Sequence, residues 1–277
     1  YIATNGIRLH YLERSGDGPT LLLAPGLAAG AYFYEALLDH LAPRLHVVAF
    51  DLRGRGASDR PDSGYTMADH AADMIGAMDA FGLERVAFGG HSFGGLLTYV
   101  MAADYPDRIE RGVVIDAPAE VDPTVMEQIK PTLDRLETTF PSWEEYIEIV
   151  KGMPYYADWE WDPALEVFYR SDLAELPDGG VRSVCRPEHI HQAMQGTLDV
   201  DWDDTVRRIE QPILFIRATE PFGPPGYPPI VPAEKAHLTM DRLSNGRYAE
   251  FAGNHITFLF GESAGMVADE IVNFVTG

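Results

Sequence analysis

Residues 90–94 read Gly-His-Ser-Phe-Gly and place Ser92 between two glycines in a G-x-S-x-G arrangement. The segment follows a short apolar run at residues 85–89 and leads into an apolar stretch at residues 93–104, so it lies at a predicted strand-to-helix turn. The glycines leave room for a tight turn because they lack β-carbons, and such a turn lifts the serine hydroxyl clear of the sheet. We therefore predict that Ser92 is a nucleophile; an ordinary serine in a glycine-rich turn is the alternative.

A serine hydroxyl is a weak nucleophile at its free pKa and needs a base that is itself oriented by an acid. His255 lies in the segment Gly253-Asn254-His255, directly after a β-prone run at residues 248–251. The other eight histidines lie within predicted helices, at strand edges or, for His91, inside the turn itself. We predict that His255 is the base.

Two carboxylates follow predicted strands and are candidates for the acid. Asp116 ends the run at residues 112–116, and Glu220 follows the run at residues 212–217. Both lie at the carboxyl ends of predicted parallel strands, where open α/β sheets build their sites. A carboxylate at such a position can instead cap a turn or pair with an arginine such as Arg217. Spacing alone leaves both candidates open.

An acyl-transfer site also needs two N–H donors for the oxyanion that forms on the substrate. The residue after the nucleophile, Phe93, offers one backbone N–H group. Leu27 offers the other, in the turn Pro25-Gly26-Leu27 that follows an apolar run at residues 20–24. Gly26 permits the turn, and Pro25 removes only its own donor.

Short apolar strands and amphipathic helices alternate along most of the chain, which predicts an α/β fold with a mostly parallel sheet covered on both faces. Asn5-Gly6 predicts a hairpin turn. The predicted strands are residues 20–24, 46–50, 85–89, 112–116, 212–217 and 248–251, and the predicted helices are residues 67–81, 93–104 and 263–275.

The pattern changes over residues 119–209, which contain 20 Asp and Glu against 8 Lys and Arg and hold all four tryptophans. Helical periodicity recurs there, without strand alternation. We predict a helical insertion at residues 119–209 over a core formed by residues 1–118 and 210–277. Some of its aromatic residues must form its own core, and others are expected to cover an apolar pocket. The predicted pocket residues are Gly26, Trp143, Tyr155, Tyr156, Trp159, Trp161, Phe222 and Ile256.

Residues 90–94, the segment Asp-Leu-Arg-Gly-Arg-Gly-Ala-Ser-Asp at residues 51–59 and the late His255 together resemble the α/β-hydrolase superfamily. The resemblance covers the chain outside the insertion, which is similar to the cap of that family. The glycines of residues 51–59 favour a tight turn under the rim of the site, in which Arg53 and Asp59 tie loops together rather than act in catalysis.

The resemblance also bears on the acid. The family usually carries Gly-x-x-Asp after the penultimate strand, whereas residues 218–223 read Ala-Thr-Glu-Pro-Phe-Gly. This loop and residues 253–257 are similar to polyketide thioesterases. In those enzymes and in zearalenone-type lactonases the acid follows the strand before the cap, and Asp116 matches that position. The resemblance therefore favours Asp116 over Glu220.

Composition excludes several classes of function. Lys and Arg total 21 against 43 Asp and Glu, a formal net charge of −22, which disfavours nucleic acids and anionic membranes as partners. One cysteine rules out an internal disulfide framework, and no apolar run is long enough for a membrane helix. His189 and His191 lack a third ligand at a fixed spacing, so we expect no metal site. We expect a cytoplasmic protein, since no signal peptide is visible. We also expect the protein to be a monomer or a homodimer.

These features predict a cofactor-free serine hydrolase that cleaves a neutral, hydrophobic carboxylic ester or lactone through an acyl-enzyme on Ser92. The negative net charge, with no basic cluster beyond Arg207-Arg208, disfavours anionic thioesters. Epoxide and halide hydrolases of this fold need an aspartate nucleophile, and position 92 is serine. The alternatives are a thioesterase or acyltransferase, a carbon–carbon bond hydrolase, a perhydrolase and, least favoured, a non-catalytic ligand receptor.

Overall fold

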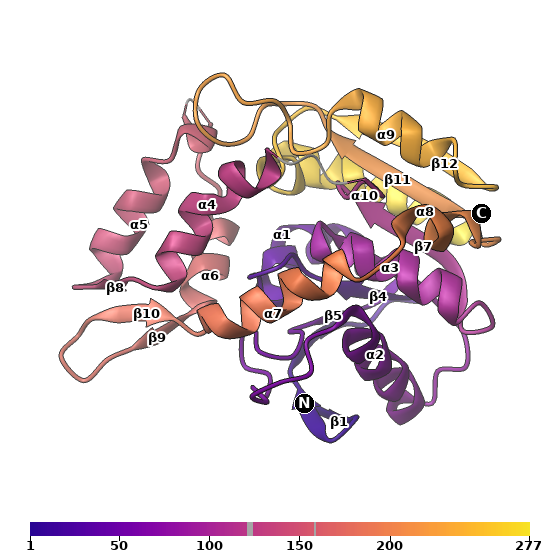
Figure 1. Cartoon of the computed structure of the whole chain (residues 1–277), viewed down its shortest axis with the longest axis horizontal. Helices are drawn as coiled ribbons and strands as arrows, with labels where there is room; N and C mark the ends of the chain where they lie inside the picture. The colour runs from indigo at the N-terminus through magenta and orange to yellow at the C-terminus, as the bar shows by residue number, and fades with distance from the viewer. Residues whose placement is uncertain (121–123, 158) are drawn as a thin grey trace.

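A computed structural model of the chain describes residues 1–120, 124–157 and 159–277. Its centre is a seven-stranded sheet with the order β12-β11-β7-β6-β4-β5-β3 (Figure 1). Every neighbouring pair in this sheet is parallel except β3 and β5, which are antiparallel. The strands are β3 (Tyr11–Arg14), β4 (Thr20–Ala24), β5 (His46–Phe50), β6 (Val86–His91), β7 (Ile109–Ile115), β11 (Ile213–Ala218) and β12 (Gly246–Phe251).

Helices cover both faces of this sheet, as the alternation of strands and helices in the sequence predicts. α1 (Glu35–Leu41) packs against α10 (Gly261–Thr276), and α2 (Met67–Phe81) packs against α3 (Phe93–Asp104). Figure 1 shows the two groups on opposite faces of the sheet. Because β4, β6 and β11 are therefore buried on both sides, their sequences are continuous apolar runs rather than alternating ones.

Local signals set the ends of several elements. Thr66 and Asp69 form a reciprocal capping box at the start of α2, and Gly82 ends that helix with a left-handed φ of 70°. A separate antiparallel hairpin, β1 (Ile2–Thr4) and β2 (Ile7–Leu9), turns at Asn5-Gly6, where both residues have positive φ.

Between β7 and β11 the chain forms the predicted insertion, but not from helices alone. Three short strands pair antiparallel in the order β8-β10-β9, so the expectation of an all-helical insertion was wrong on this point. Strands of two or three residues are too short to show an alternating pattern in the sequence. The elements are α4 (Val125–Leu136), β8 (Thr139–Phe140), α5 (Trp143–Lys151), η2 (Pro154–Tyr156), α6 (Pro163–Ser171), β9 (Leu173–Glu175), β10 (Val181–Ser183), α7 (Pro187–Leu198) and α8 (Trp202–Arg207).

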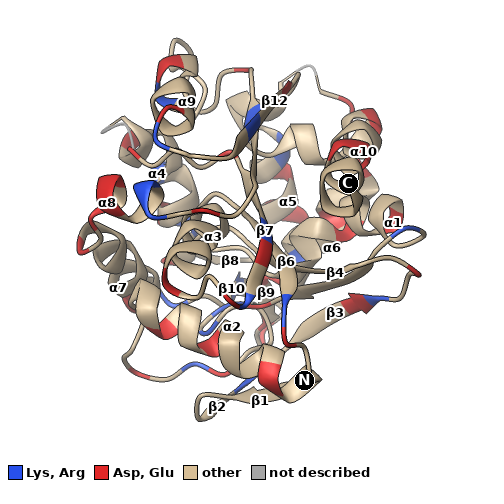
Figure 2. Cartoon of the chain, turned by 90° about the vertical axis from the view of Figure 1, so that its right-hand side faces the viewer, with Lys and Arg blue, Asp and Glu red and all other residues tan. Residues whose placement is uncertain are grey.

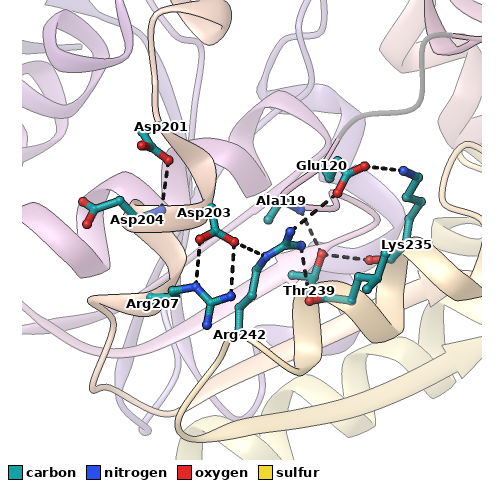
Figure 3. A network of polar contacts seen from close by, with 10 residues as sticks. Ala119, Glu120, Asp201, Asp203, Asp204, Arg207, Lys235, Thr239 and Arg242 are labelled. Atoms are coloured by element: carbon teal, nitrogen blue, oxygen red, sulfur yellow. Dashed lines mark hydrogen bonds and ion pairs between the residues drawn. The ribbon is translucent and has the colours of Figure 1, made fainter.

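The last helices of the insertion lie on the core. α7 packs against α2, and α8 packs against α3. Helix α9 (Ala233–Met240) and the residues around it connect both ends of the insertion (Figure 3). Just after α9, Arg242 donates to Asp203 in α8 at 2.7 Å and lies 3.5 Å from Glu120, which precedes α4. Lys235 contacts the same Glu120 at 2.5 Å.

Acidic residues are spread over the helices on the surface, including α2, α8 and α10 (Figure 2). Among the helices of the described ranges, none combines the length and the apolar character that crossing a membrane requires.

Candidate active site

Ser92 lies at the turn between β6 and α3 in a strained conformation, with φ 54° and ψ −113°. Its N–H group donates to the carbonyl oxygen of Ile115 on the neighbouring strand at 2.8 Å. A β-carbon at position 90 would collide with the backbone of Gly94, and one at position 94 would collide with the backbone of Ala24. The two glycines are therefore needed for the turn that holds Ser92 half-buried at the carboxyl end of the sheet.

His255 and Asp116 meet beside this turn. His255 Nδ1 lies 2.6 Å from Asp116 Oδ2, and both side chains are buried. The second carboxylate oxygen, Asp116 Oδ1, accepts from the backbone N–H of Ala218 at 2.9 Å. Because an imidazole bound to a carboxylate donates through Nδ1, this contact leaves Nε2 of His255 free to accept a proton.

The other candidate acid lies elsewhere. The side chain of Glu220 is exposed, and its backbone N–H donates to the carbonyl oxygen of Gly253 at 2.9 Å. In the described part of the chain no hydrogen bond joins the Glu220 carboxylate to His255, and none joins Ser92 Oγ to His255. Catalytic hydrogen bonds are often long before substrate binds, so the second absence does not separate the nucleophile from its base.

A second histidine, His91, contacts the backbone of His255. The sequence pattern identifies His91 only as a residue of the turn that carries Ser92. His91 Nε2 lies 2.8 Å from the carbonyl oxygen of His255, and the two rings are 4.3 Å apart. Burial lowers the pKa of His91 well below its ordinary value, and the neighbouring His255 lowers it further. His91 is therefore neutral and donates through Nε2, which fixes the loop that carries His255.

Both predicted oxyanion donors are available. Gly26 lies against His91 and Ser92, which brings the turn that carries Leu27 next to the nucleophile. Among the described residues the Leu27 N–H group has no hydrogen-bond acceptor. Phe93 is the first residue of α3, so its N–H group has no acceptor within the helix.

Arg55, fully buried, contacts both of these residues. Its Nε donates to the Leu27 carbonyl oxygen at 2.9 Å, and its guanidinium lies 5.3 Å from the centre of the Phe93 ring. Nη1 donates to the carbonyl oxygen of Arg53, and no carboxylate of the described chain lies within ion-pair distance. Burial lowers the pKa of Arg55 to about 10, so it remains charged at neutral pH. The glycine-rich sequence of residues 51–59 predicts a structural turn and carries no local signal for the role of Arg55.

Some predicted pocket residues lie next to His255. The Phe222 ring lies edge-on to His255 with centres 5.6 Å apart, and Tyr155 stacks on Phe222 at 4.4 Å. Asn254 Nδ2 donates to the Tyr155 carbonyl oxygen at 2.6 Å, so the loop of the base is bonded directly to the insertion. Ile256, half-buried, donates through its N–H group to Asn254 Oδ1.

Other predicted pocket residues belong mainly to the interior of the insertion. Tyr156 bonds to the Tyr169 hydroxyl at 2.7 Å, and the rings of Trp159 and Trp161 pack against Tyr156. Trp143 stacks on Tyr146 with centres 6.0 Å apart. The structure therefore places Gly26, Tyr155, Phe222 and Ile256 beside Ser92 or His255, while the ring contacts of these four aromatic residues are with other residues of the insertion.

The whole arrangement has counterparts in known proteins. A sequence model of the α/β hydrolase fold matches residues 19–262. The chain belongs to the α/β-hydrolase family. It is 28% identical over 209 residues to 2-(acetamidomethylene)succinate hydrolase of Mesorhizobium japonicum, covering 74% of this chain and 72% of that one. It is 26% identical over 269 residues to a putative carbamate hydrolase of Caulobacter sp. strain K31, covering 95% and 92%.

Solved structures agree on the fold. The crystal structure of E-2-(acetamidomethylene)succinate hydrolase superposes with a TM-score of 0.83 at 23% identity, over 99% of this chain and 97% of that one. The enol-lactonase of Burkholderia xenovorans LB400 gives 0.78 at 24% identity over 100% of both chains. The sequence relatives are named as hydrolases, which supports hydrolase activity for this α/β-hydrolase; the bond that it cleaves is a separate question.

Proposed function

We propose that this α/β-hydrolase cleaves a carboxylic ester or lactone through an acyl-enzyme on Ser92, without a cofactor. The observation that carries the proposal is the 2.6 Å contact between His255 and Asp116 beside the strained turn of Ser92. A buried base held by a buried acid next to a strained turn that carries a half-buried serine is the geometry that nucleophilic acyl transfer needs.

In the proposed mechanism Ser92 Oγ attacks the carbonyl carbon and His255 Nε2 accepts its proton. Asp116 stabilises the imidazolium through the Nδ1 contact, and the N–H groups of Leu27 and Phe93 donate to the oxyanion. His255 then gives the proton to the departing alkoxide. A water molecule, deprotonated by His255, attacks the acyl-enzyme and releases the acid and Ser92.

The group next to the scissile bond is proposed to be apolar, since the Phe222 ring lies edge-on to His255 and the Tyr155 ring stacks on Phe222. The net charge of −22 favours neutral substrates over acyl-CoA or acyl-carrier proteins at long range.

A second candidate is hydrolysis of an acyl carbon–nitrogen bond. It is favoured by the sequence relatives, which are named 2-(acetamidomethylene)succinate hydrolase and putative carbamate hydrolase. The same nucleophile, base and oxyanion donors would serve, with the amine in place of the alkoxide as leaving group.

The test is turnover of a macrolactone, its open-chain ester, the matching amide and an acyl-CoA, each with the wild type and with Ser92→Ala. Labelling by a fluorophosphonate, located by mass spectrometry, identifies the nucleophile independently of the substrate. We expect ester or lactone hydrolysis that Ser92→Ala abolishes, and label on Ser92. Faster amide turnover would favour the second candidate, preference for acyl-CoA would favour a thioesterase, and label on another residue would contradict the mechanism.

A further inference from the structure

Arg135 in α4 is a buried cation without a counter-ion. Only 8% of the residue is exposed, and among the described residues no carboxylate lies within ion-pair distance of it. Its hydrogen bonds are to its own helix, at 3.2 Å to the Pro131 carbonyl oxygen and 3.2 Å to Thr132 Oγ1. Of the buried arginines of the core, Arg53 makes two bonds of 2.6 Å to Asp73, whereas Arg55, like Arg135, has no ion pair among the described residues. Buried charges are ordinarily paired, so Arg135 calls for an explanation.

Tyrosine hydroxyl groups surround this guanidinium. Tyr146, Tyr155 and Tyr169 all interact electrostatically with Arg135, and all three are buried. Tyr155 Oη is buried, interacts with the Arg135 guanidinium and forms no hydrogen bond of standard geometry among the described residues. A carboxylate only accepts hydrogen bonds, and a guanidinium beside hydroxyl donors is the environment that binds it best.

This cluster lies on the insertion side of the active site. The ring of Tyr155 stacks on Phe222, which lies edge-on to His255, and the Tyr155 carbonyl oxygen is bonded to Asn254. Tyr155 therefore connects the environment of Arg135 with the base at which the scissile bond must lie.

A cleft next to α4 is also positively charged, although the molecule as a whole is acidic. Leu136, the residue after Arg135, lines a cleft of about 670 Å³ together with three arginines, Arg60, Arg182 and Arg186, and one carboxylate, Glu188. Arg60 donates to three backbone carbonyl groups, and none of the three arginines has an ion pair to a carboxylate in the described ranges. Unpaired cations in a cleft raise the local concentration of anions despite an opposite net charge.

We propose that Arg135, with the Tyr155 hydroxyl, binds a carboxylate of the substrate, so that the substrate is an ester or lactone that carries a second, free carboxylate. This assignment rests on the proposed function and replaces one part of the sequence-based prediction, the expectation of a fully neutral substrate. The net charge of the protein affects how fast a charged substrate approaches, whereas a buried charge such as Arg135 affects which charged group of the substrate is bound in the site.

The experiment compares aryl monoesters of adipic and suberic acid, which carry a free carboxylate, with the same molecules capped as methyl esters. The variants are Arg135→Met, Arg135→Lys and Tyr155→Phe. Arg170→Met, which removes an exposed arginine of the insertion paired with Glu175, is the control.

We expect the wild type to prefer the free carboxylate, and Arg135→Met to lose about 100-fold in kcat/KM on it while the capped ester changes little. Arg135→Lys should recover part of the preference because it keeps the charge, and Arg170→Met should leave it unchanged. Equal losses on both esters, or an unchanged ratio between them, would overturn the assignment while leaving ester hydrolysis intact.

Calorimetric binding of adipate and suberate to Ser92→Ala requires no turnover and therefore separates this inference from the proposed function. Binding that Arg135→Met removes and Arg135→Lys keeps would support the carboxylate site even if no ester were cleaved. If Arg135→Met does not fold, Arg135→Gln and Tyr155→Phe take its place, and unchanged binding in both would contradict the proposal.

Discussion

The two sides of the site differ in how their polar groups are satisfied. On the core side, formed by the loops after β6, β7 and β12, both carboxylate oxygens of Asp116 accept hydrogen bonds and Nε2 of His91 is bonded, while the buried Nδ1 of His91 has no partner among the described residues. On the insertion side, formed by α4, η2 and α6, the described residues place no carboxylate within ion-pair distance of Arg135, and its charge faces tyrosine side chains such as Tyr155.

This difference separates preorganisation from recognition. A catalytic base must be held in one tautomer and position before substrate arrives, so its partners are built into the fold. A group that recognises the substrate keeps a free bonding site for it, and a buried polar atom without a partner is the visible sign. Four substitutions test this difference between the two sides, and their expected effects decrease in the order Asp116→Asn, Arg55→Met, Asp172→Asn and Arg242→Gln.

Asp116→Asn should have the largest effect. The asparagine keeps the shape but favours the wrong tautomer of His255, so kcat should fall by about 1000-fold or more with little change in thermal stability. Steady-state kinetics and a melting curve measure both. Glu220→Gln is the matched control, because the Glu220 side chain is exposed and among the described residues no hydrogen bond joins it to His255. If Glu220→Gln lost most of its kcat while Asp116→Asn stayed active, Glu220 rather than Asp116 would be the acid that orients His255.

The sequence predicts the core side of the site better than the insertion side, for a physical reason. Ser92 carries a local signal, since it directly follows the fully buried strand β6, and His255 lies in the short loop after the partly exposed strand β12. The prediction of a mostly parallel α/β sheet is confirmed, and the strands at residues 20–24 and 46–50 have the predicted bounds. The choice of acid needs the distance from Asp116 to His255 across the sheet, which spacing does not contain.

Arg55 and Arg135 show what local patterns omit. Arg55 lies in a glycine-rich turn that suggests only a loop, and its contacts with Leu27 and Phe93 join residues far apart in the chain. Arg135 is one of few cations in an acidic stretch, which suggests a solvated surface with acidic neighbours. That no carboxylate pairs with it is a property of the packing, which only the fold determines.

Arg55→Met should lower kcat by about 30-fold, with a smaller change in KM, because Arg55 positions the backbone of Leu27 and lies against Phe93. Its lowered pKa means that charged Arg55 opposes folding at neutral pH, an effect relieved as pH rises above about 10. Replacement by an apolar side chain of similar length should therefore cost little stability. A parallel loss of stability and activity would instead indicate that Arg55 only holds the fold.

Asp172 of the insertion lies near Asp51 of the core, so its substitution tests how a buried carboxyl at this junction affects stability. Burial raises the pKa of this carboxyl well above its ordinary value, and the nearby carboxylate of Asp51 raises it further. In the window between the ordinary and the raised pKa the folded state binds the proton and the unfolded state does not, so stability falls as pH rises. Asp172→Asn replaces the carboxyl by a neutral amide, so no negative charge forms at this buried position as the pH rises.

Melting curves of Asp172→Asn and the wild type at pH about 5 and about 8 measure this effect. The variant should gain a few degrees over the wild type, and the gain should be larger at the higher pH. Asp107→Asn, at an exposed position on the core, should show no such dependence. A gain that shrinks with rising pH would mean that Asp172 is stabilised as a carboxylate, contrary to its burial beside Asp51.

Arg242→Gln should have the smallest effect, although the contacts that it removes in Figure 3 connect both ends of the insertion. Glu120 and Asp203 are about half exposed, so water and salt screen their attraction to Arg242. The melting temperature should fall by less than about two degrees at low salt and by less still at high salt. Hydrogen exchange of α4 and α8 should rise more than that of β6 and β7. A loss as large at high salt as at low salt would mean that the packed stem of Arg242, rather than its charge, holds the insertion, because packing is insensitive to screening.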